Sequence, residues 1–454
     1  MKLIPLKSIK FFSADERSQR QLKNIYISFI YKSVAIGCTF LTVPLTLHYL
    51  DVSTYGIWLT ITSIVGWIGF FDGGLGNGLK NKLSEAVSNQ QMSKARSYVT
   101  SAYIGIIGIV ICIVVIFMIV SSFINWTAVL KSPVLLTGEI KTTVYIVFIL
   151  FGIRLIVDLM SVILSAHQLV GIVALINMII NLFILAGTFI ITKIVHSNKL
   201  VYLGSFISVV PVIILIMTSI FFFKKEYKHL APTIKSFDLG ILKEIVSLGM
   251  TFFVIQIAAL IIFSSDNLII TQLFGPGEVA SYNICYKYFG ILTLGWSMII
   301  TPYWVAFNEA FVKKDFKWLR KTIRFLLKAW LLLLIGVIIF IAFSTKAYSI
   351  WVGKGIIIPL QLSLHMGLFI VLSTNLNICA YFLNGIGKIK LQFYASIFSG
   401  LSNIPLTIYF AKNLHMGISG VILGTSLSII LGGILMWIQT YKVIRQEDDG
   451  IWSK

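Results

Sequence analysis

The chain has 454 residues, of which 57% are hydrophobic and 12% charged, with a mean hydropathy of +0.93 and a formal net charge of +20. So high an apolar content excludes an ordinary soluble domain. A net charge of +20 would suggest a nucleic-acid partner in a soluble protein. Here we expect none, because in a membrane protein basic residues mark the cytoplasmic side and attract anionic lipid headgroups.

Twelve apolar stretches of roughly membrane-spanning length follow one another along the chain. A helix needs about 20 apolar residues to cross the hydrocarbon core of a bilayer. In chain order the spans are predicted near residues 25–47, 55–72, 99–120, 143–165, 169–192, 200–223, 248–273, 280–304, 325–344, 358–383, 391–411 and 416–440. The pattern predicts an all-α polytopic membrane protein with 12 transmembrane helices.

The basic residues collect in the links on one side of this layout. If the N-terminus is inside, the inner segments hold 26 of the 37 Lys and Arg residues, whereas the outer links hold 7. Short cytoplasmic links carry such an excess in membrane proteins. We therefore expect both termini to be cytoplasmic.

The first six spans contain three ionisable residues that a bilayer would disfavour. Each costs at least about 2.5 to 3.5 kcal/mol at the centre of a span, so each is a functional candidate. Arg154 and Asp158 are spaced i, i+4 in the fourth span and can pair on one helix face. Such a pair either rigidifies the bundle or acts as a latch that a substrate anion or a proton opens. Lys32, in the first span, has no acidic residue one turn away.

The middle link, residues 224–247, contains five lysines and then an amphipathic run. Asp238 is a candidate N-cap, and Leu239, Leu242, Ile245 and Val246 form an apolar stripe at helical spacing. This pattern predicts an interfacial helix that lies on the inner leaflet and tethers two halves. A helix bound by a calmodulin-like partner is the alternative.

The seventh and eighth spans carry one charge each. Asp266 lies in the polar run Ser264-Ser265-Asp266-Asn267, and Lys287 lies at a similar depth, so the two could pair. If buried, Asp266 could titrate and serve as a coupling-ion or gating residue. An unpaired cation within a membrane needs water or an anion. If Lys32 and Lys287 both face inward, we therefore expect a hydrated cavity suited to anionic cargo, with phosphate as the obvious group.

A weak internal repeat appears at an offset of 224 residues. Glu85-Ala86 followed by Arg96 corresponds to Glu309-Ala310 followed by Arg320, each between the second and third span of its half. Halves with an even number of spans are parallel, related by an axis along the membrane normal. We predict residues 1–223 as an N-terminal six-helix bundle, 224–247 as a basic amphipathic cytoplasmic link and 248–454 as a C-terminal six-helix bundle with a short cytoplasmic tail, around a central cavity.

The links are too short for a soluble catalytic domain. The longest are about two dozen residues, and the six His residues are scattered singly. We find no catalytic constellation and no spacing typical of a metal site. The chain is therefore expected not to be an enzyme and to need no cofactor or metal.

Two segments resemble a known family. The stretch from Tyr55-Gly-Ile-Trp58 to Phe71-Asp72-Gly-Gly-Leu-Gly-Asn-Gly78, with Glu85-Ala86, resembles the second helix and following link of O-antigen and polysaccharide flippases of the Wzx type. Asp266-Asn-Leu-Ile-Ile, Glu278-Val-Ala-Ser-Tyr282 and Lys287 are similar to the seventh-to-eighth helix signature of the same multidrug/oligosaccharidyl-lipid/polysaccharide exporter superfamily. The motifs are more specific for the superfamily than for one cargo.

The resemblance implies two six-helix bundles that alternate between inward-open and outward-open forms. The implied cargo is an undecaprenyl-pyrophosphate-linked oligosaccharide, an O-antigen or capsule repeat unit, moved from the inner to the outer leaflet of the bacterial plasma membrane. A polysaccharide polymerase and a chain-length regulator are implied partners. Lys32 and Lys287 match family cations that hold pyrophosphate, and Arg154 is a weaker match; Asp266 and Asp158 remain as coupling candidates.

Two alternatives stay open. Drug exporters of the superfamily often have an acid in the first helix, whereas this chain has Lys32 there. That departure favours anionic cargo over an ion-coupled multidrug or small-molecule exporter, which is the runner-up. A membrane enzyme such as a glycan polymerase or ligase would need a large outer link with catalytic acids or His.

Overall fold

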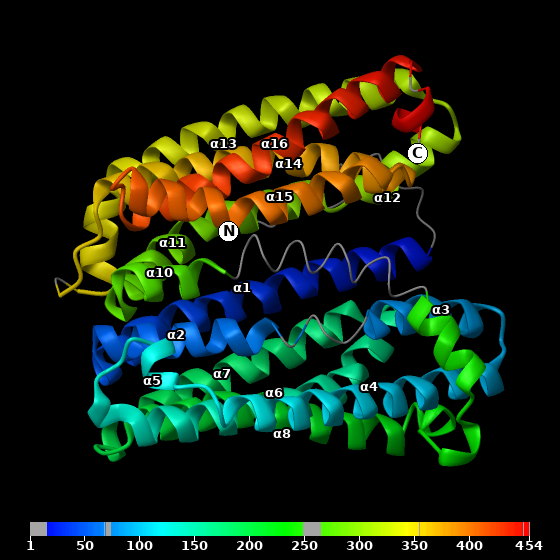
Figure 1. The fold of residues 1–454 in the computed structure, drawn as a ribbon. Helices are drawn as coiled ribbons and strands as arrows, with labels where there is room; N and C mark the ends of the chain where they lie inside the picture. The colour runs from blue at the N-terminus through cyan, green and yellow to red at the C-terminus, as the bar shows by residue number, and fades with distance from the viewer. Residues whose placement is uncertain are drawn as a thin grey trace, which may run out of the picture. The chain divides into compact units, whose positions relative to one another are not determined.

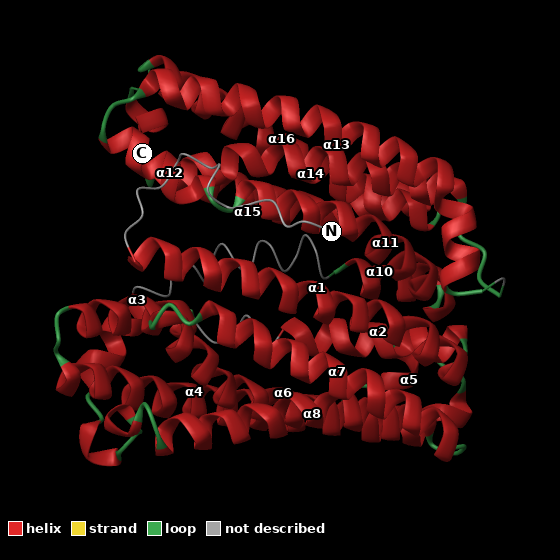
Figure 2. Cartoon of the chain, turned by 180° about the vertical axis from the view of Figure 1, so that it is seen from behind, coloured by secondary structure: helices red, strands yellow, loops and turns green. Residues whose placement is uncertain are grey.

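The computed structural model describes residues 16–67, 69, 74–247, 265–353, 355–447 and 449–453, and these are almost entirely helical, with no strand among them (Figure 2). The α-helices are α1 (Glu16–Leu50), α2 (Val52–Gly66), α3 (Leu75–Ser88), α4 (Met92–Ser121), α5 (Trp126–Val129), α6 (Thr137–Ala166), α7 (Val170–Ile194), α8 (Lys199–Lys224), α10 (Asp266–Phe274), α11 (Pro276–Ile300), α12 (Tyr303–Val312), α13 (Phe316–Trp351), α14 (Leu360–Ile386), α15 (Lys390–Ile408) and α16 (Ile418–Arg445). Residues 239–247 are also helical. Short 3-10 turns lie at Val134–Leu136, Lys228–Leu230, Ile234–Ser236 and Gly450–Ser453, and a π-helix, Tyr409–Asn413, follows α15.

The predicted all-α membrane fold is confirmed. Within the described part of the chain, eight helices are long and apolar enough to cross a membrane. Helices α2, α11 and α15 match three further predicted spans. Of the seventh predicted span, residues 248–264 lie outside the described residues, and its last part forms α10. The motif residues Phe71, Asp72 and Gly73 also lie outside them.

The helices group by contact into two units. Unit 1 comprises Met1–Thr46, Asp72–Ile119 and Tyr145–Gly249, and unit 2 comprises Leu47–Phe71, Val120–Val144 and Met250–Lys454. Unit 2 thus takes α2, α5 and the neighbouring helix ends from the N-terminal half of the chain. The predicted domain boundary at residues 224–247 stays a prediction about the chain halves.

The core of unit 1 lies among α3, α4, α6, α7 and α8 (Figure 1). Fully buried apolar side chains from these helices fill it, including Leu79, Val99, Met160 and Ile163. Their outer faces carry large exposed apolar side chains, such as Ile116 at 60% exposure. In a chain without water around its middle, such faces contact lipid.

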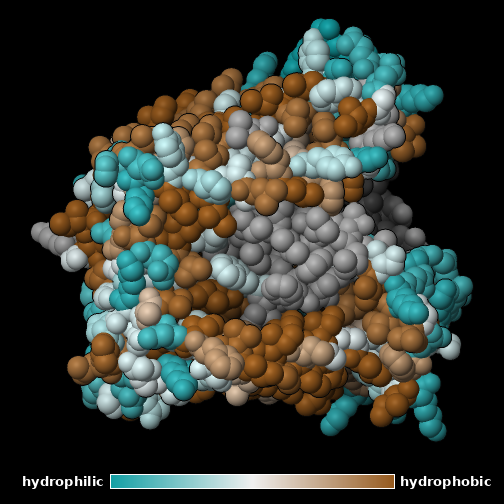
Figure 3. Space-filling model, in the orientation of Figure 1, coloured by the Kyte–Doolittle hydropathy of each residue, from teal (hydrophilic) through white to brown (hydrophobic). Residues whose placement is uncertain are grey.

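The core of unit 2 forms where α11, α12, α13, α14 and α16 meet. Phe307, Phe382 and Trp296 are almost wholly buried and are its largest side chains. The rings of Phe307 and Phe382 pack edge to face, with centroids 5.2 Å apart. Space-filling Figure 3 shows brown side chains over the middle of each unit and teal ones gathered towards the ends. This is the arrangement expected of a polytopic membrane protein.

The predicted internal repeat is visible in the backbone. Helices α3 and α12 both end in a turn that leads directly into a long helix, α4 or α13. Gln90 has a φ of 57°, and Lys314, 224 positions later, has a φ of 56°. In each turn the next amide donates to the carbonyl five positions back over 2.9 Å. A left-handed residue with such a bond is a common way to end a helix, and the two halves use it at equivalent places.

The middle link differs from its prediction. Asp238 does cap the helix of residues 239–247, because its Oδ1 accepts from the amides of Gly240 and Ile241 at 2.7 and 3.1 Å. Only Leu239 of its apolar stripe is exposed, however, and the other three stripe residues pack inside unit 1. Ile245 is fully buried, and Leu242 packs in the core of unit 1 against α3 and α4. The core of unit 1, rather than the lipid of the inner leaflet, covers these apolar side chains.

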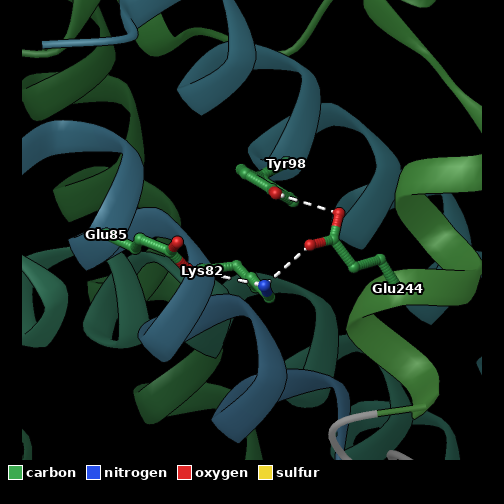
Figure 4. A network of polar contacts seen from close by, with 4 residues as sticks. All are labelled: Lys82, Glu85, Tyr98 and Glu244. Carbon is green, nitrogen blue, oxygen red and sulfur yellow. Dashed lines mark hydrogen bonds and ion pairs between the residues drawn. The ribbon is translucent and has the colours of Figure 1, made fainter. Parts of the chain in front are cut away.

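Polar contacts fix the link helix in this position. Glu244 lies 2.7 Å from the Lys82 amine of α3 and accepts from the hydroxyl of Tyr98 of α4 at 3.0 Å (Figure 4). Gly78 of α3 also allows close approach, since a Cβ there would lie 2.3 Å from the carbonyl oxygen of Ile245. The link is thus a fixed part of unit 1.

Candidate functional site

Lys287 is a half-buried cation on α11 of unit 2. Its amine donates to the hydroxyl of Tyr55, on α2, over 3.5 Å. Among the described residues no carboxylate forms an ion pair with it. The predicted pair of Lys287 with Asp266 is therefore wrong, although both belong to unit 2. A long contact with one neutral hydroxyl leaves most of the ammonium's hydrogen-bonding capacity unused.

The Lys287–Tyr55 contact depends on close packing between α2 and α11. A Cβ on Gly56 would lie 1.7 Å from the carbonyl oxygen of Pro276, the first residue of α11. Only glycine allows the two backbones to approach so closely. Gly275, just before α11, has a φ of 93°, a conformation that also favours glycine. In the Tyr-Gly pair of the sequence motif, Tyr55 thus supplies the hydroxyl that contacts Lys287. Gly56 supplies the space that lets α11 approach α2.

A ladder of uncharged polar side chains joins α2 to α10 and α11. The hydroxyls of Thr60 and Thr271 lie 2.7 Å apart. The Asn267 amide donates to Ser63 at 2.6 Å, and the Asn283 amide donates to the Asn267 carbonyl oxygen at 2.7 Å. These residues are not among the site residues predicted from the sequence, all of which are charged. Their i, i+3 and i+4 spacing on two short helices was the available signal.

Asp266 is buried, at 4% exposure, and held by hydroxyls. Tyr282 donates to its Oδ2 at 2.5 Å, and Thr425 donates to its Oδ1 at 3.3 Å. The Asn403 amide in turn donates to Thr425 at 3.1 Å. This network ties α10 to α11, α15 and α16. A buried carboxylate normally needs a cation or several donors, and here hydroxyls take the place that was predicted for Lys287.

A small cavity of about 50 Å³ opens beside this carboxylate. It is lined by Asp266, Asn267, Tyr282, Asn283, Tyr286, Phe369, Ile422 and Thr425. The volume suffices for a water molecule, and the lining supplies several polar partners. The site can thus hold water against a carboxylate that is otherwise shielded. Among the described residues, no group of three His, Cys, Asp or Glu side chains could hold a metal ion.

Arg154 and Asp158 lie on α6 in unit 1. Arg154 is half-buried and Asp158 exposed, and no ion pair joins them in the described part of the chain. The predicted pair is therefore absent. An exposed i, i+4 pair contributes only about 0.3 to 0.5 kcal/mol, and a base preceding an acid is the weaker order on a helix. Neither effect suffices to fix two long side chains together.

Lys32 lies on α1 in unit 1, where its side chain is exposed. It too has no ion-pair partner among the residues that the structure describes. The five predicted site residues therefore fall into two environments. Asp266 and Lys287 are enclosed by helices of unit 2, whereas Lys32, Arg154 and Asp158 occupy open or half-open positions of unit 1.

Comparisons with known proteins bear on the family of this chain. The family described as "Polysaccharide biosynthesis protein" matches residues 21–307, and the family MatE matches residues 252–409. A Yersinia pseudotuberculosis protein named "Putative O-antigen export protein" is 22% identical over 410 residues, which cover 88% of this chain and 90% of the relative. A Salmonella typhimurium protein named "Putative O-antigen transporter" is 24% identical over 89% of this chain and 92% of its own length. These relatives are named for transport or export rather than for an enzymatic reaction.

Solved structures share the fold at low sequence identity. The inward-facing form of a multidrug resistance MATE transporter of the MOP superfamily aligns with a TM-score of 0.74 and 13% identity over 94% of this chain and 98% of its own. The lipid II flippase MurJ aligns with a TM-score of 0.66 and 17% identity over 92% and 87% of the two chains. The predicted resemblance to Wzx-type flippases and their superfamily is confirmed. Because the first family covers well over half of its length, this multi-pass membrane protein belongs to the polysaccharide biosynthesis protein family.

Proposed function

We propose that the protein is a flippase that moves an undecaprenyl-pyrophosphate-linked oligosaccharide from the inner to the outer leaflet of the bacterial plasma membrane. The family, the names of the O-antigen relatives and the fold shared with a lipid II flippase support this cargo class. The cargo is an O-antigen or capsule repeat unit, and both termini face the cytoplasm. No bond is made or broken, so the protein is a transporter and not an enzyme.

The proposal rests on the environment of Lys287, a half-buried cation without a carboxylate partner among the described residues. A cation in a membrane span without a carboxylate partner favours an anionic ligand, since leaving it unpaired in hydrocarbon is costly. Pyrophosphate supplies several oxygen acceptors for the three N–H groups of the ammonium. Lys32 and Arg154 of unit 1 are the two further intramembrane cations that we propose as cargo-binding residues. The prenyl tail stays in lipid while the sugar crosses in the hydrated interior.

Asp266 is the proposed coupling residue. Its carboxylate is shielded by helices yet adjoins a cavity of water size. A proton or small cation that reaches this cavity changes the charge next to α10, α11, α15 and α16, which the hydrogen-bond network links. Asp158 is a weaker candidate because it is exposed. An exposed side chain packs against few neighbours, so a change of its charge alters helix packing little.

The polar ladder between α2 and α10 is the proposed outer gate. In the proposed orientation, Thr60 and Ser63 lie in the outer half of their span, so the ladder lies towards the outer side of unit 2. Alternating access then requires the Thr60–Thr271 and Ser63–Asn267 contacts to break. Hydrogen bonds between neutral groups contribute only about 0.5 to 1.5 kcal/mol each, so a gate made of them can open without a large barrier.

The test is deletion of the gene, with surface polysaccharide and lipid-linked oligosaccharide measured by leaflet. Loss of surface glycan, together with accumulation of completed units on the inner leaflet, is expected for a flippase. Accumulation on the outer leaflet would indicate a failure of the polymerase step instead. A polysaccharide polymerase and a chain-length regulator are the proposed partners that consume the product there. Re-expression of the intact protein should restore the glycan.

A second candidate is an ion-coupled multidrug or small-molecule exporter. The MatE match and the likeness to a multidrug transporter favour it. In that case deletion leaves surface glycan unchanged and lowers the drug concentration that the cells tolerate. The same deletion strain distinguishes the two functions.

A further inference from the structure

The segment between α8 and the link helix, together with the exposed face of that helix, carries apolar and basic side chains. Ile234 is 89% exposed, Leu239 57% and Phe237 38%. Lys228, Lys235 and Lys243 are exposed beside them in the sequence. We call these six residues the link patch. Exposed apolar side chains that gather with basic ones mark an interaction surface, and these three lie within six residues of the sequence.

The link patch lies alongside the inner part of α4. The Arg96 side chain of α4 donates to the carbonyl of Ala231 at 3.0 Å. Further along α4, Ser101 exchanges hydrogen bonds with the backbone of Asp238, both at 3.1 Å. Residue 101 is nine positions into α4, or about 14 Å at 1.5 Å per residue. The apolar span is predicted to start near residue 99, so the segment runs down to the membrane boundary.

The position and chemistry of the link patch point to one occupant. At the boundary, apolar side chains reach the acyl region while basic ones meet headgroups. None of the three lysines has an ion-pair partner among the described residues. Each lysine near an anionic leaflet contributes about 1 kcal/mol of attraction. We propose that the link patch binds anionic phospholipid of the inner leaflet and anchors the inner end of unit 1 there.

This proposal reverses the roles that the sequence suggested for the two parts of the link. The amphipathic helix was predicted to lie on the leaflet, yet it packs on α3 and α4 and is fastened through Glu244 (Figure 4). The preceding irregular segment takes the membrane contact, together with Leu239 and Lys243 on the exposed face of the helix. The proposal rests on the orientation given under the proposed function, but it requires no particular cargo.

The test uses the full chain in nanodiscs, with the four native cysteines replaced by alanine. Ile234→Cys carries an environment-sensitive fluorophore, and the membrane contains phosphatidylcholine with a shallow lipid-borne quencher and increasing phosphatidylglycerol. We expect quenching to rise with the phosphatidylglycerol fraction. A lipid-borne quencher is preferable to iodide, because an anionic membrane repels iodide whether or not the patch inserts.

Charge variants make the test specific. The three single variants are Lys228→Gln, Lys235→Gln and Lys243→Gln. In each of them, the phosphatidylglycerol fraction needed for half-maximal quenching should rise by about fivefold. The control changes the exposed Lys314, Lys317 and Lys321 of unit 2 to Gln and should leave that fraction unchanged. Thermal unfolding in detergent checks that all variants are folded.

Three results would overturn the proposal. Quenching that does not depend on phosphatidylglycerol would exclude anionic lipid as the ligand of the link patch. An equal loss in the control would show a general effect of net charge. Protection of the fluorophore by an acidic soluble protein, with no lipid quenching, would identify a protein partner instead. None of these readouts involves transport, so they leave the flippase proposal to its own test.

Discussion

The two units hold their intramembrane charges in different ways. In unit 2, Asp266 is buried among hydroxyl donors and Lys287 is half-buried against Tyr55. In unit 1, Arg154 and Asp158 share a helix face without pairing, and Lys32 is exposed. Each unit nevertheless contains one copy of the repeated turn, after α3 in unit 1 and after α12 in unit 2.

The difference teaches where a change of charge would have structural consequences. A buried group is bonded to several helices, so a change in its charge or size alters their packing. An exposed group can adjust by moving its own side chain. We therefore expect unit 2 to respond strongly to substitution and unit 1 weakly, and the predictions below test this contrast in order of expected effect.

The largest effect should come from locking α2 to α10. In a background without native cysteines, Thr60→Cys with Thr271→Cys places two thiols where hydroxyls lie 2.7 Å apart. Oxidation should join them and stop glycan export, because the proposed outer gate cannot open, and reduction should restore it. Gel mobility after site-specific proteolysis verifies the bond. Each single variant is the control, and normal export by the cross-linked protein would exclude this contact as a gate.

Lys287→Ala should lower export by about 30-fold or more. Removal of one partner from a buried charged contact costs about 2 kcal/mol or more. Lys287→Arg should keep part of the activity because it preserves the charge. The matched control is Lys328→Ala, which removes an exposed lysine from another span, α13. Surface glycan per cell at equal protein level is the measurement, and wild-type export by Lys287→Ala would refute the role.

Asp266→Asn should reduce ion-coupled transport by about 5-fold to 150-fold, the range of typical coupling energies. The amide keeps the size of the carboxyl group but cannot take up or release a proton. Asp158→Asn is the comparison in unit 1 and should change transport less than twofold. Uptake of lipid-linked oligosaccharide into vesicles, with and without an ion gradient, gives the readout. Equal losses in the two variants would contradict the contrast between the units.

The smallest effect concerns the link helix of unit 1. The hydrogen bond from Lys82 holds the pKa of Glu244 below its ordinary value of 4.5, and Glu244 raises the pKa of Lys82. The contact therefore stabilises the docked link above the ordinary pKa of Glu244, and this stabilisation is lost as the pH falls through the lowered value. At alkaline pH it is lost again, as the pH rises through the raised pKa of Lys82.

Amide hydrogen exchange over residues 239–247, corrected for intrinsic rates, measures this docking. An exposed ion pair contributes at most about 1 kcal/mol, so we expect up to about fivefold faster exchange at low pH. Glu244→Gln should exchange faster at neutral pH and lose the dependence on acid. An unchanged profile in Glu244→Gln would show that apolar packing alone holds the helix.

Much of the architecture could be predicted from the sequence. Span lengths follow from bilayer thickness, so the apolar stretches located eleven of the twelve predicted spans as described helices and the end of the seventh as α10. The repeat followed from two matching short motifs, and the Asp238 cap from residue type. These features are local, or depend only on the solvent that surrounds a helix.

The partners of the charged residues could not be predicted in the same way. Nothing in the spacing of Asp266 indicates that Thr425, 159 positions away, bonds it in place of Lys287. The approach of Gly56 to Pro276 likewise appears only when α2 is known to pack on α11. For the link, the amphipathic pattern was correct, but a pattern does not say whether lipid or protein covers the apolar stripe.

The matching turns at Gln90 and Lys314 carry an evolutionary consequence. Neither residue is glycine, yet both adopt a left-handed conformation that most side chains disfavour. Such turns are common at helix ends, so the match gains its weight from the Glu-Ala and Arg motif that recurs at the same offset of 224 residues. Duplication of an ancestral six-helix gene accounts for it simply. The turn and the motif together are what duplication of a six-helix segment would leave behind.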